Sequence, residues 1–166
     1  MTTHGCAHAG AQHCGRFVIG ADGAFSSATD QQISERVQPY LDLGVTVHVS
    51  MDLTTSSVLD GSAHRGIAAA VAVTVRHNLT GLMVDYEPRT DYTLQHQLAY
   101  ANLLRALASE LHAVGRQLDM CVSDWSILTN FSLYSATGVD RMMSMGSTYS
   151  GVNVTRDKSW YVLDLV

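Results

Sequence analysis

Short apolar runs alternate with long amphipathic segments along most of this 166-residue chain. The runs are rich in Val, Ile, Met and aromatic residues, which is typical of strands. Strands that alternate with helices form right-handed βαβ units, so the sequence predicts an α/β domain with a parallel sheet. Parallel strands are expected around residues 17–20, 45–50, 81–86, 118–123 and 141–145, and the run 159–166 is a candidate for a further strand.

Helices are expected in the segments between these strands, at residues 29–44, 62–79 and 91–115. The first begins with a capping-box pair, Thr29 and Gln32, and the last ends at Gly115. Apolar residues spaced three and four apart define the buried faces. These are Ile33, Val37, Tyr40 and Leu41 in the first helix, Ile67, Val71 and Val75 in the second, and Leu94, Leu98, Ala101, Leu104, Ala108 and Leu111 in the third.

Composition excludes several classes of protein. A hydrophobic share of 46% and a charged share of 15% are typical of a globular domain with a core. A net charge of −5 argues against a nucleic-acid partner, and no apolar run reaches the roughly 18 residues of a membrane helix. No signal peptide is visible, but Asn78, Asn130 and Asn153 stand in N-x-S/T sequons, so a secreted or endomembrane location is expected if the full-length protein carries a signal peptide.

The first fifteen residues differ from the rest. They are rich in Gly and Ala and hold five side chains that can bind metals: His4, Cys6, His8, His13 and Cys14. Paired C-x-x-C spacing is absent, so residues 1–15 are expected to be disordered or irregular, without a metal or another cofactor. A metal site and a Cys6–Cys14 disulfide are the alternatives.

The stretch GLMVDYEP, residues 81–88, starts as a buried strand and ends with two acids, Asp85 and Glu87. Side chains alternate along a strand, so both acids face the same side, about 6.6 Å apart. The C-terminal ends of parallel strands are where α/β enzymes build their active sites, and two close carboxyl groups raise the proton affinity of at least one. Glycosidic cleavage needs such a protonated acid. The alternative is that both are rim residues, in salt bridges with Arg76, Arg89 or Arg105.

The same stretch, extended by Thr80, resembles the signature D-G-x-D-x-D-W-E of the glycoside hydrolase family 18 chitinases. Gly81, Asp85, Tyr86 and Glu87 match the glycine, the last aspartate, the aromatic residue and the acid. Thr80 and Met83 stand where the family has its first two aspartates. Residues 45–52 are similar to the family's third strand, and 139–149 to its sixth, where Met145 and Tyr149 would line the sugar site.

The resemblance implies a (β/α)8 TIM-barrel fold. Such a barrel has about 250 residues, so residues 16–166 are expected to form an incomplete, apparently truncated barrel of five to six parallel strands. It also implies cleavage of N-acetylglucosamine-containing glycans by substrate-assisted, retaining hydrolysis. Glu87 would be the general acid/base, and Asp85 would orient the N-acetyl group. Side chains expected to contact the glycan are Tyr86, Asp124, Trp125, Met145 and Tyr149.

Two other functions remain open. Met83 stands where the family has its second aspartate, and the absence of that carboxylate favours a catalytically inactive, lectin-like carbohydrate-binding barrel. A metal-dependent phosphodiesterase would use Asp85, Glu87 and His48. His48, Ser50 and Asp52 alternate along one strand, and a hydrogen-bonded network inside the barrel is the expected role for these three.

Overall fold

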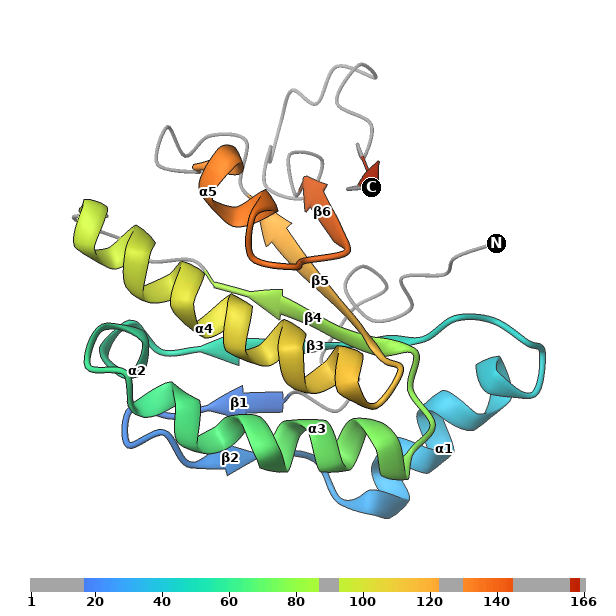
Figure 1. Ribbon diagram of the computed structural model, residues 1–166. Helices are drawn as coiled ribbons and strands as arrows, with labels where there is room; N and C mark the ends of the chain where they lie inside the picture. Colours follow the sequence, from blue (N-terminus) through green and yellow to red (C-terminus); the bar gives the residue numbers. More distant parts are fainter. Residues whose placement is uncertain (1–16, 87–92, 123–129, 145–161, 165–166) are drawn as a thin grey trace, which may run out of the picture.

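The computed structural model describes residues 17–86, 93–122, 130–144 and 162–164 (Figure 1). Strands and helices alternate along most of it, as the sequence predicts. In chain order they are β1 (Phe17–Ile19), β2 (Phe25–Ser26), α1 (Asp30–Leu41), β3 (His48–Leu53), α2 (Thr55–Leu59), the 3-10 helix η1 (Ser62–Gly66), α3 (Ile67–Arg76), β4 (Gly81–Asp85), α4 (Leu94–Ala113), β5 (Gln117–Val122), α5 (Phe131–Ser135), β6 (Arg141–Ser144) and β7 (Val162–Asp164).

The strands form one seven-stranded sheet in the order β2-β1-β3-β4-β5-β6-β7. β1, β3, β4, β5 and β6 pair parallel with one another, whereas β2 pairs antiparallel with β1 and β7 pairs antiparallel with β6 at the two edges. Within the described residues the two edges do not pair with each other, so the sheet is open. The prediction of an incomplete barrel of parallel strands is confirmed, with five strands in the parallel part.

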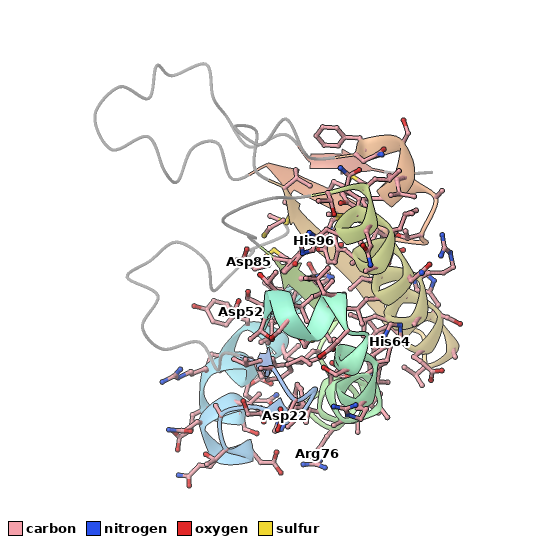
Figure 2. The ribbon with its side chains drawn as sticks, turned by 90° about the vertical axis from the view of Figure 1, so that its left-hand side faces the viewer. Asp22, Asp52, His64, Arg76, Asp85 and His96 are labelled. Carbon is pink, nitrogen blue, oxygen red and sulfur yellow. The ribbon has the colours of Figure 1, made fainter. Side chains whose placement is uncertain are left out.

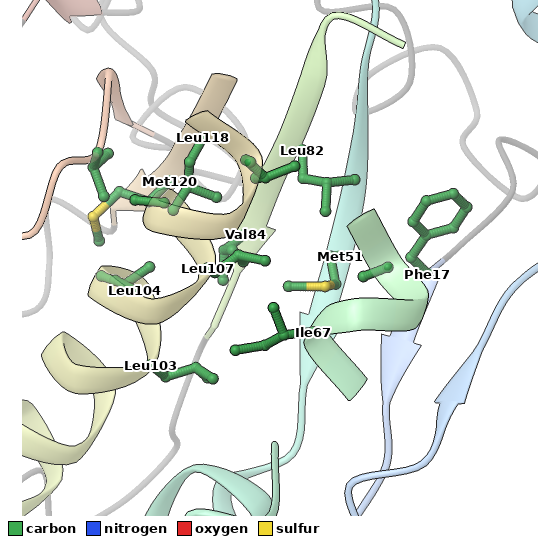
Figure 3. Close-up of a cluster of buried hydrophobic side chains, with 14 of the residues drawn as sticks. Phe17, Met51, Ile67, Leu82, Val84, Leu103, Leu104, Leu107, Leu118 and Met120 are labelled. Atoms are coloured by element: carbon green, nitrogen blue, oxygen red, sulfur yellow. The ribbon is translucent and has the colours of Figure 1, made fainter. Parts of the chain in front are cut away.

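One face of the sheet carries the hydrophobic core. Alternate strand residues such as Met51, Leu82 and Val84 are at most 2% exposed, and they contact α3 and α4, which lie side by side across this face (Figure 1). Figure 3 shows Ile67 from α3 and Leu107 from α4 packed against these strand residues. The intervening strand residues lie on the opposite face, called the inner face below.

The helix ends follow the sequence signals closely. Thr29 caps α1 with a complete capping box, because its hydroxyl accepts from the Gln32 amide and its own amide donates to the Gln32 side chain. Gly44 and Gly115 have positive φ angles of 68° and 69° just after their helices, a conformation that favours glycine.

Four side chains of the predicted buried faces are exposed. Tyr40 is 41% exposed, Val75 43%, Leu94 63% and Leu98 47%. In α3, residues 67, 70, 71 and 74 lie on the side that packs against the sheet. Thr74 is therefore buried, and Val75 points toward solvent. In α4 the buried side consists of Tyr100, Ala101, Leu103, Leu104, Leu107, Ala108 and Leu111, and the first turns extend beyond it. The predicted helical periodicity was correct, but the predicted buried faces included residues near the helix ends that are exposed to solvent.

Strand positions also differ in detail. β3 begins at His48, three residues later than expected, and continues to Leu53. Val47 instead anchors the start of β3, because its amide donates to the Thr80 hydroxyl at 2.9 Å and its carbonyl accepts from the Thr80 amide at 2.8 Å. Thr80 therefore has a structural role where the chitinase signature has an aspartate.

Two of the three sequons lie in described residues. Asn78 is exposed in the turn after α3, where its side chain accepts from Arg116. The side chain of Asn130 accepts from the Leu133 amide and so caps α5. Among the described helices, none combines the length and the apolar character of a segment that crosses a bilayer.

Candidate active site

Two aspartates lie side by side where β3 and β4 end. Asp52 and Asp85 are direct partners in the parallel register, and each is half-buried. Direct partners on neighbouring strands project to the same face, which here is the inner face. Figure 2 shows Asp52 and Asp85 along one edge of the structure, with His96 from the first turn of α4 at the same edge. The prediction that Asp85 stands at the C-terminal end of a parallel strand is therefore confirmed.

Most of the predicted site residues lie outside the described residues. These are the predicted acid Glu87 and four of the five predicted glycan contacts, Asp124, Trp125, Met145 and Tyr149. The N-terminal segment 1–15, including Cys6 and Cys14, also lies outside them. These assignments stay predictions.

Tyr86 is described, and it points away from Asp85. It is 8% exposed and belongs to the hydrophobic core on the helix side of the sheet, as the strand alternation predicts. Its ring lies 4.7 Å from the ring of Tyr100, between centroids. Burial raises the pKa of Tyr86 above its ordinary value. Its predicted contact with a glycan stays untested.

Directly below Asp85 the inner face is apolar. Met83, Cys121 and Met143, from β4, β5 and β6, form a small buried cluster separate from the main core, and each is at most 6% exposed. Met83 fills the place that an aspartate has in the chitinase signature. The carboxyl group of Asp85 thus has a thioether beneath it on its own strand, and the neighbouring carboxyl group comes from Asp52 on β3.

A buried polar network lies further down the inner face. Asp119 is fully buried on β5, and its Oδ1 accepts from Nε of Arg141 on β6 at 3.2 Å. Nη2 of Arg141 lies 3.0 Å from the side-chain oxygen of Gln117 and 3.3 Å from Nε2 of His48. Nε2 of His48 is also 3.5 Å from Oδ2 of Asp119. A carboxylate this deep is stable only with such a counter-charge and hydrogen bonds.

This network confirms the hydrogen-bonded interior role expected for His48. Sequence reasoning missed its other three residues, Gln117, Asp119 and Arg141. The available signal was the alternation in QLDMCV, which places Gln117, Asp119 and Cys121 on one face of a strand whose other residues are apolar. Among the described residues, no group of three or more His, Cys, Asp or Glu side chains is placed to hold a metal ion. His48 pairs with Gly81, four residues before Asp85 on β4, and Glu87 lies outside the described residues, so the phosphodiesterase hypothesis stays untested.

Comparisons with known proteins bear on the fold. No protein-family model matches the chain, and no curated protein sequence matches it significantly. Solved structures do match. A chitinase from Chromobacterium violaceum has a TM-score of 0.65 at 16% identity, over 78% of this chain and 45% of that one. A putative sporulation-specific glycosylase from Bacillus subtilis has a TM-score of 0.66 at 16% identity, over 78% and 47%.

A chitinase from Rhizomucor miehei has a TM-score of 0.62 at 21% identity, over 78% of this chain and 50% of that one. These likenesses show that the chain has a (β/α) fold similar to the barrels of these proteins. The chain spans about half the length of these structures, so it corresponds to part of such a barrel. The fold expected from the stretch around Asp85 and Glu87 is thereby confirmed, whereas the chemistry of that stretch is a separate question.

Proposed function

We propose that this chain carries the catalytic strand of a chitinase-like glycoside hydrolase that cleaves glycans containing N-acetylglucosamine. The observation that carries the proposal is the position of Asp85, on the inner face at the C-terminal end of β4, within a fold similar to chitinases. In parallel (β/α) folds this end of the strands forms the active site. Glu87 follows two residues later in the sequence.

The proposed reaction has two steps. Glu87 donates its proton to the glycosidic oxygen, while the carbonyl oxygen of the substrate's own N-acetyl group attacks the anomeric carbon and the glycosidic bond breaks. Glu87 then takes a proton from water, whose oxygen opens the cyclic intermediate at the same carbon. Two displacements at one carbon retain the configuration. Asp85 orients the acetamido N–H during the attack.

The surroundings of Asp85 suit this role. Met83, Cys121 and Met143 form an apolar floor, and charged interactions are stronger where water is excluded. Asp52 places a second carboxyl group beside Asp85, and like charges this close favour retention of a proton by one of a pair. Met83 stands where the chitinase signature has an aspartate, so in this chain the carboxyl group beside Asp85 would come from Asp52 on β3.

The test is Glu87→Gln, measured with fluorogenic N-acetylglucosamine oligosaccharides and, for binding, by calorimetry. A general acid contributes about 10²- to 10⁴-fold, so turnover should fall by at least 100-fold while oligosaccharide binding stays nearly unchanged. Glu110→Gln is the matched control, since Glu110 is exposed on α4 and the chemical change is the same. Unchanged hydrolysis in Glu87→Gln contradicts the proposal.

Asp85→Asn separates the two roles. We expect a smaller loss than for Glu87→Gln, confined to substrates that carry the N-acetyl group. Tight oligosaccharide binding without any hydrolysis by the unmodified protein would instead support the lectin-like function.

A further inference from the structure

A serine, a histidine and an aspartate are joined by hydrogen bonds where α1 meets the end of α3, and they are called the Ser34 triad below. Oγ of Ser34 lies 3.2 Å from Nδ1 of His77, and Nε2 of His77 lies 3.0 Å from Oδ1 of Asp30. Asp30 and Ser34 are four residues apart on α1, so they share one face of the helix and contact the same imidazole ring. A hydroxyl, an imidazole and a carboxylate in this order form the arrangement that activates serine nucleophiles.

The proton positions in the Ser34 triad follow from its carboxylate. The hydrogen bond with His77 and the neighbouring Arg76 hold the pKa of Asp30 below its ordinary value, so at neutral pH this carboxylate only accepts hydrogen bonds. Nε2 of His77 therefore carries a proton, and in the neutral ring Nδ1 is then an acceptor. The Ser34 hydroxyl donates to Nδ1, which is the geometry that lets a general base take its proton.

Exposure changes along the Ser34 triad in a way that suits a nucleophile. The His77 side chain is only 5% exposed, and its backbone amide donates to the Val73 carbonyl at the end of α3, so the ring is held in place. Nη1 of Arg76 lies 2.9 Å from Oδ2 of Asp30 and fixes the carboxylate from its other side. Ser34 itself is exposed. A reagent can therefore reach the hydroxyl from solvent, while the base behind it is shielded from water.

The Ser34 triad lies away from the end of β4. Figure 2 shows Arg76, the partner of Asp30, at the bottom of the view, whereas Asp85 and His96 lie well above it. In Figure 1, α1 passes the C-terminal end of α3, where His77 follows the helix. The triad is therefore separate from the proposed glycosidase site, and its chemistry does not depend on that proposal.

We propose that Ser34 is a nucleophile that takes the acyl group of small esters with good leaving groups. In the first step Oγ bonds to the acyl carbon, the bond from that carbon to the leaving oxygen breaks, and the Ser34 proton passes through Nδ1 of His77 to the leaving oxygen. In the second step water bonds to the acyl carbon, its proton passes through Nδ1 back to Oγ, and the carboxylic acid leaves. Asp30 is a positioning residue that holds the tautomer of His77. Because Ser34 is exposed on a helix, the expected substrates are small and reactive.

The first test is the reaction of the whole chain with an alkyl fluorophosphonate, in which a bond forms between Oγ and phosphorus, fluoride leaves, and the hydroxyl proton goes to His77. Peptide mass spectrometry gives the rate at each serine. Ser135 is the internal control, because it is also exposed on a helix but its hydroxyl donates to the Ser132 carbonyl instead of a histidine. We expect Ser34 to react about 100-fold faster than Ser135, the lower end of what a general base contributes. Equal rates at the two serines overturn the proposal.

Variants of the two partners assign their roles. His77→Gln keeps a hydrogen-bonding side chain but has no base, so the rate at Ser34 should fall about 100-fold, to that of Ser135. Asp30→Asn should slow the reaction and Asp30→Glu should restore part of the rate, because only a carboxylate holds the tautomer. Far-UV circular dichroism checks the fold, and Asp30→Asn decides the matter if His77→Gln does not fold. An unchanged rate at Ser34 in either folded variant overturns the proposal.

Turnover is tested with p-nitrophenyl acetate. An acetyl group on Ser34 should appear in the mass spectrum during steady release of nitrophenol, and Ser34→Ala should abolish both. This variant leaves the fold intact, since alanine is the residue most favourable to a helix. Equal hydrolysis by Ser34→Ala and by the unmodified chain contradicts the esterase activity.

Discussion

Removing the Asp119 carboxylate should destabilise the protein more than any change in its exposed ion pairs. Asp119 is fully buried, and its partner Arg141 has a side chain only 15% exposed. In Asp119→Leu the guanidinium group loses its counter-charge in a place that water hardly reaches. Breaking a buried pair on one side typically costs about 3–5 kcal/mol. Gln117 and His48 still accept from Arg141, so we expect a loss near the lower end, about 3 kcal/mol.

The assay is urea unfolding at pH 7, followed by far-UV circular dichroism. Asp119→Leu/Arg141→Leu removes both charges, and it should be more stable than Asp119→Leu alone by about 2 kcal/mol, since no uncompensated charge remains. The control is Arg76→Gln, which breaks an ion pair with Asp30 whose side chains are 57% and 58% exposed, and it should have a much smaller effect. A loss below about 1 kcal/mol in Asp119→Leu, or a double variant less stable than the single one, refutes the reasoning.

Three further predictions concern stability. Gly81→Ala should destabilise the fold by about 1–3 kcal/mol or more in urea unfolding, because a Cβ would lie 2.0 Å from the Gln117 carbonyl oxygen on the adjacent strand. The His77 hydrogen bond lowers the pKa of Asp30 below 3.8, so the stability lost in Asp30→Asn should be measurable at neutral pH and vanish as the pH falls through the folded-state pKa. Burial raises the pKa of Tyr100 above its ordinary value of 10.0, so above pH 10 the unfolded chain loses this proton more readily than the folded protein does. The free energy of unfolding should therefore fall above pH 10, and it should fall less steeply in Tyr100→Phe than in the unmodified protein.

The parallel sheet could be predicted because its signals are local. Each strand is short, apolar and followed by a helical pattern, and right-handed connections then leave few arrangements. The capping box at Thr29 and the glycine at 115 depend only on neighbouring residues, and both were correct. The short elements α2, α5 and β2 were missed, because five or fewer residues show no measurable periodicity.

The polar network of the inner face could not be predicted, because it depends on register. Asp119 and Arg141 are 22 residues apart, and they meet only because β5 and β6 pair at that position. The same is true of Asp52 and Asp85, which are partners across β3 and β4. A single sequence shows which face each residue takes on its own strand, but it does not show which residue lies opposite.

The burial of Tyr100 was also beyond the sequence. The helix pattern proposed for α4 contained Leu98 and Ala101 but not Tyr100, because a large aromatic residue with a polar tip fits both a surface and a core. Only the contacts with Tyr86 and Tyr134 place it behind the strand end.

The central claim is the proposal that Asp85, at the end of β4, and Glu87, two residues later in the sequence, cleave an N-acetylated glycan with the substrate's own amide as nucleophile. The most direct measurement is the configuration of the first product, followed by proton NMR as the full-length protein that contains this chain acts on a β-linked N-acetylglucosamine oligosaccharide. We predict that the β-anomer forms first and equilibrates later, and that Glu87→Gln forms no product over the same period. An α-anomer as the first product, or the same product and rate with Glu87→Gln, contradicts the claim.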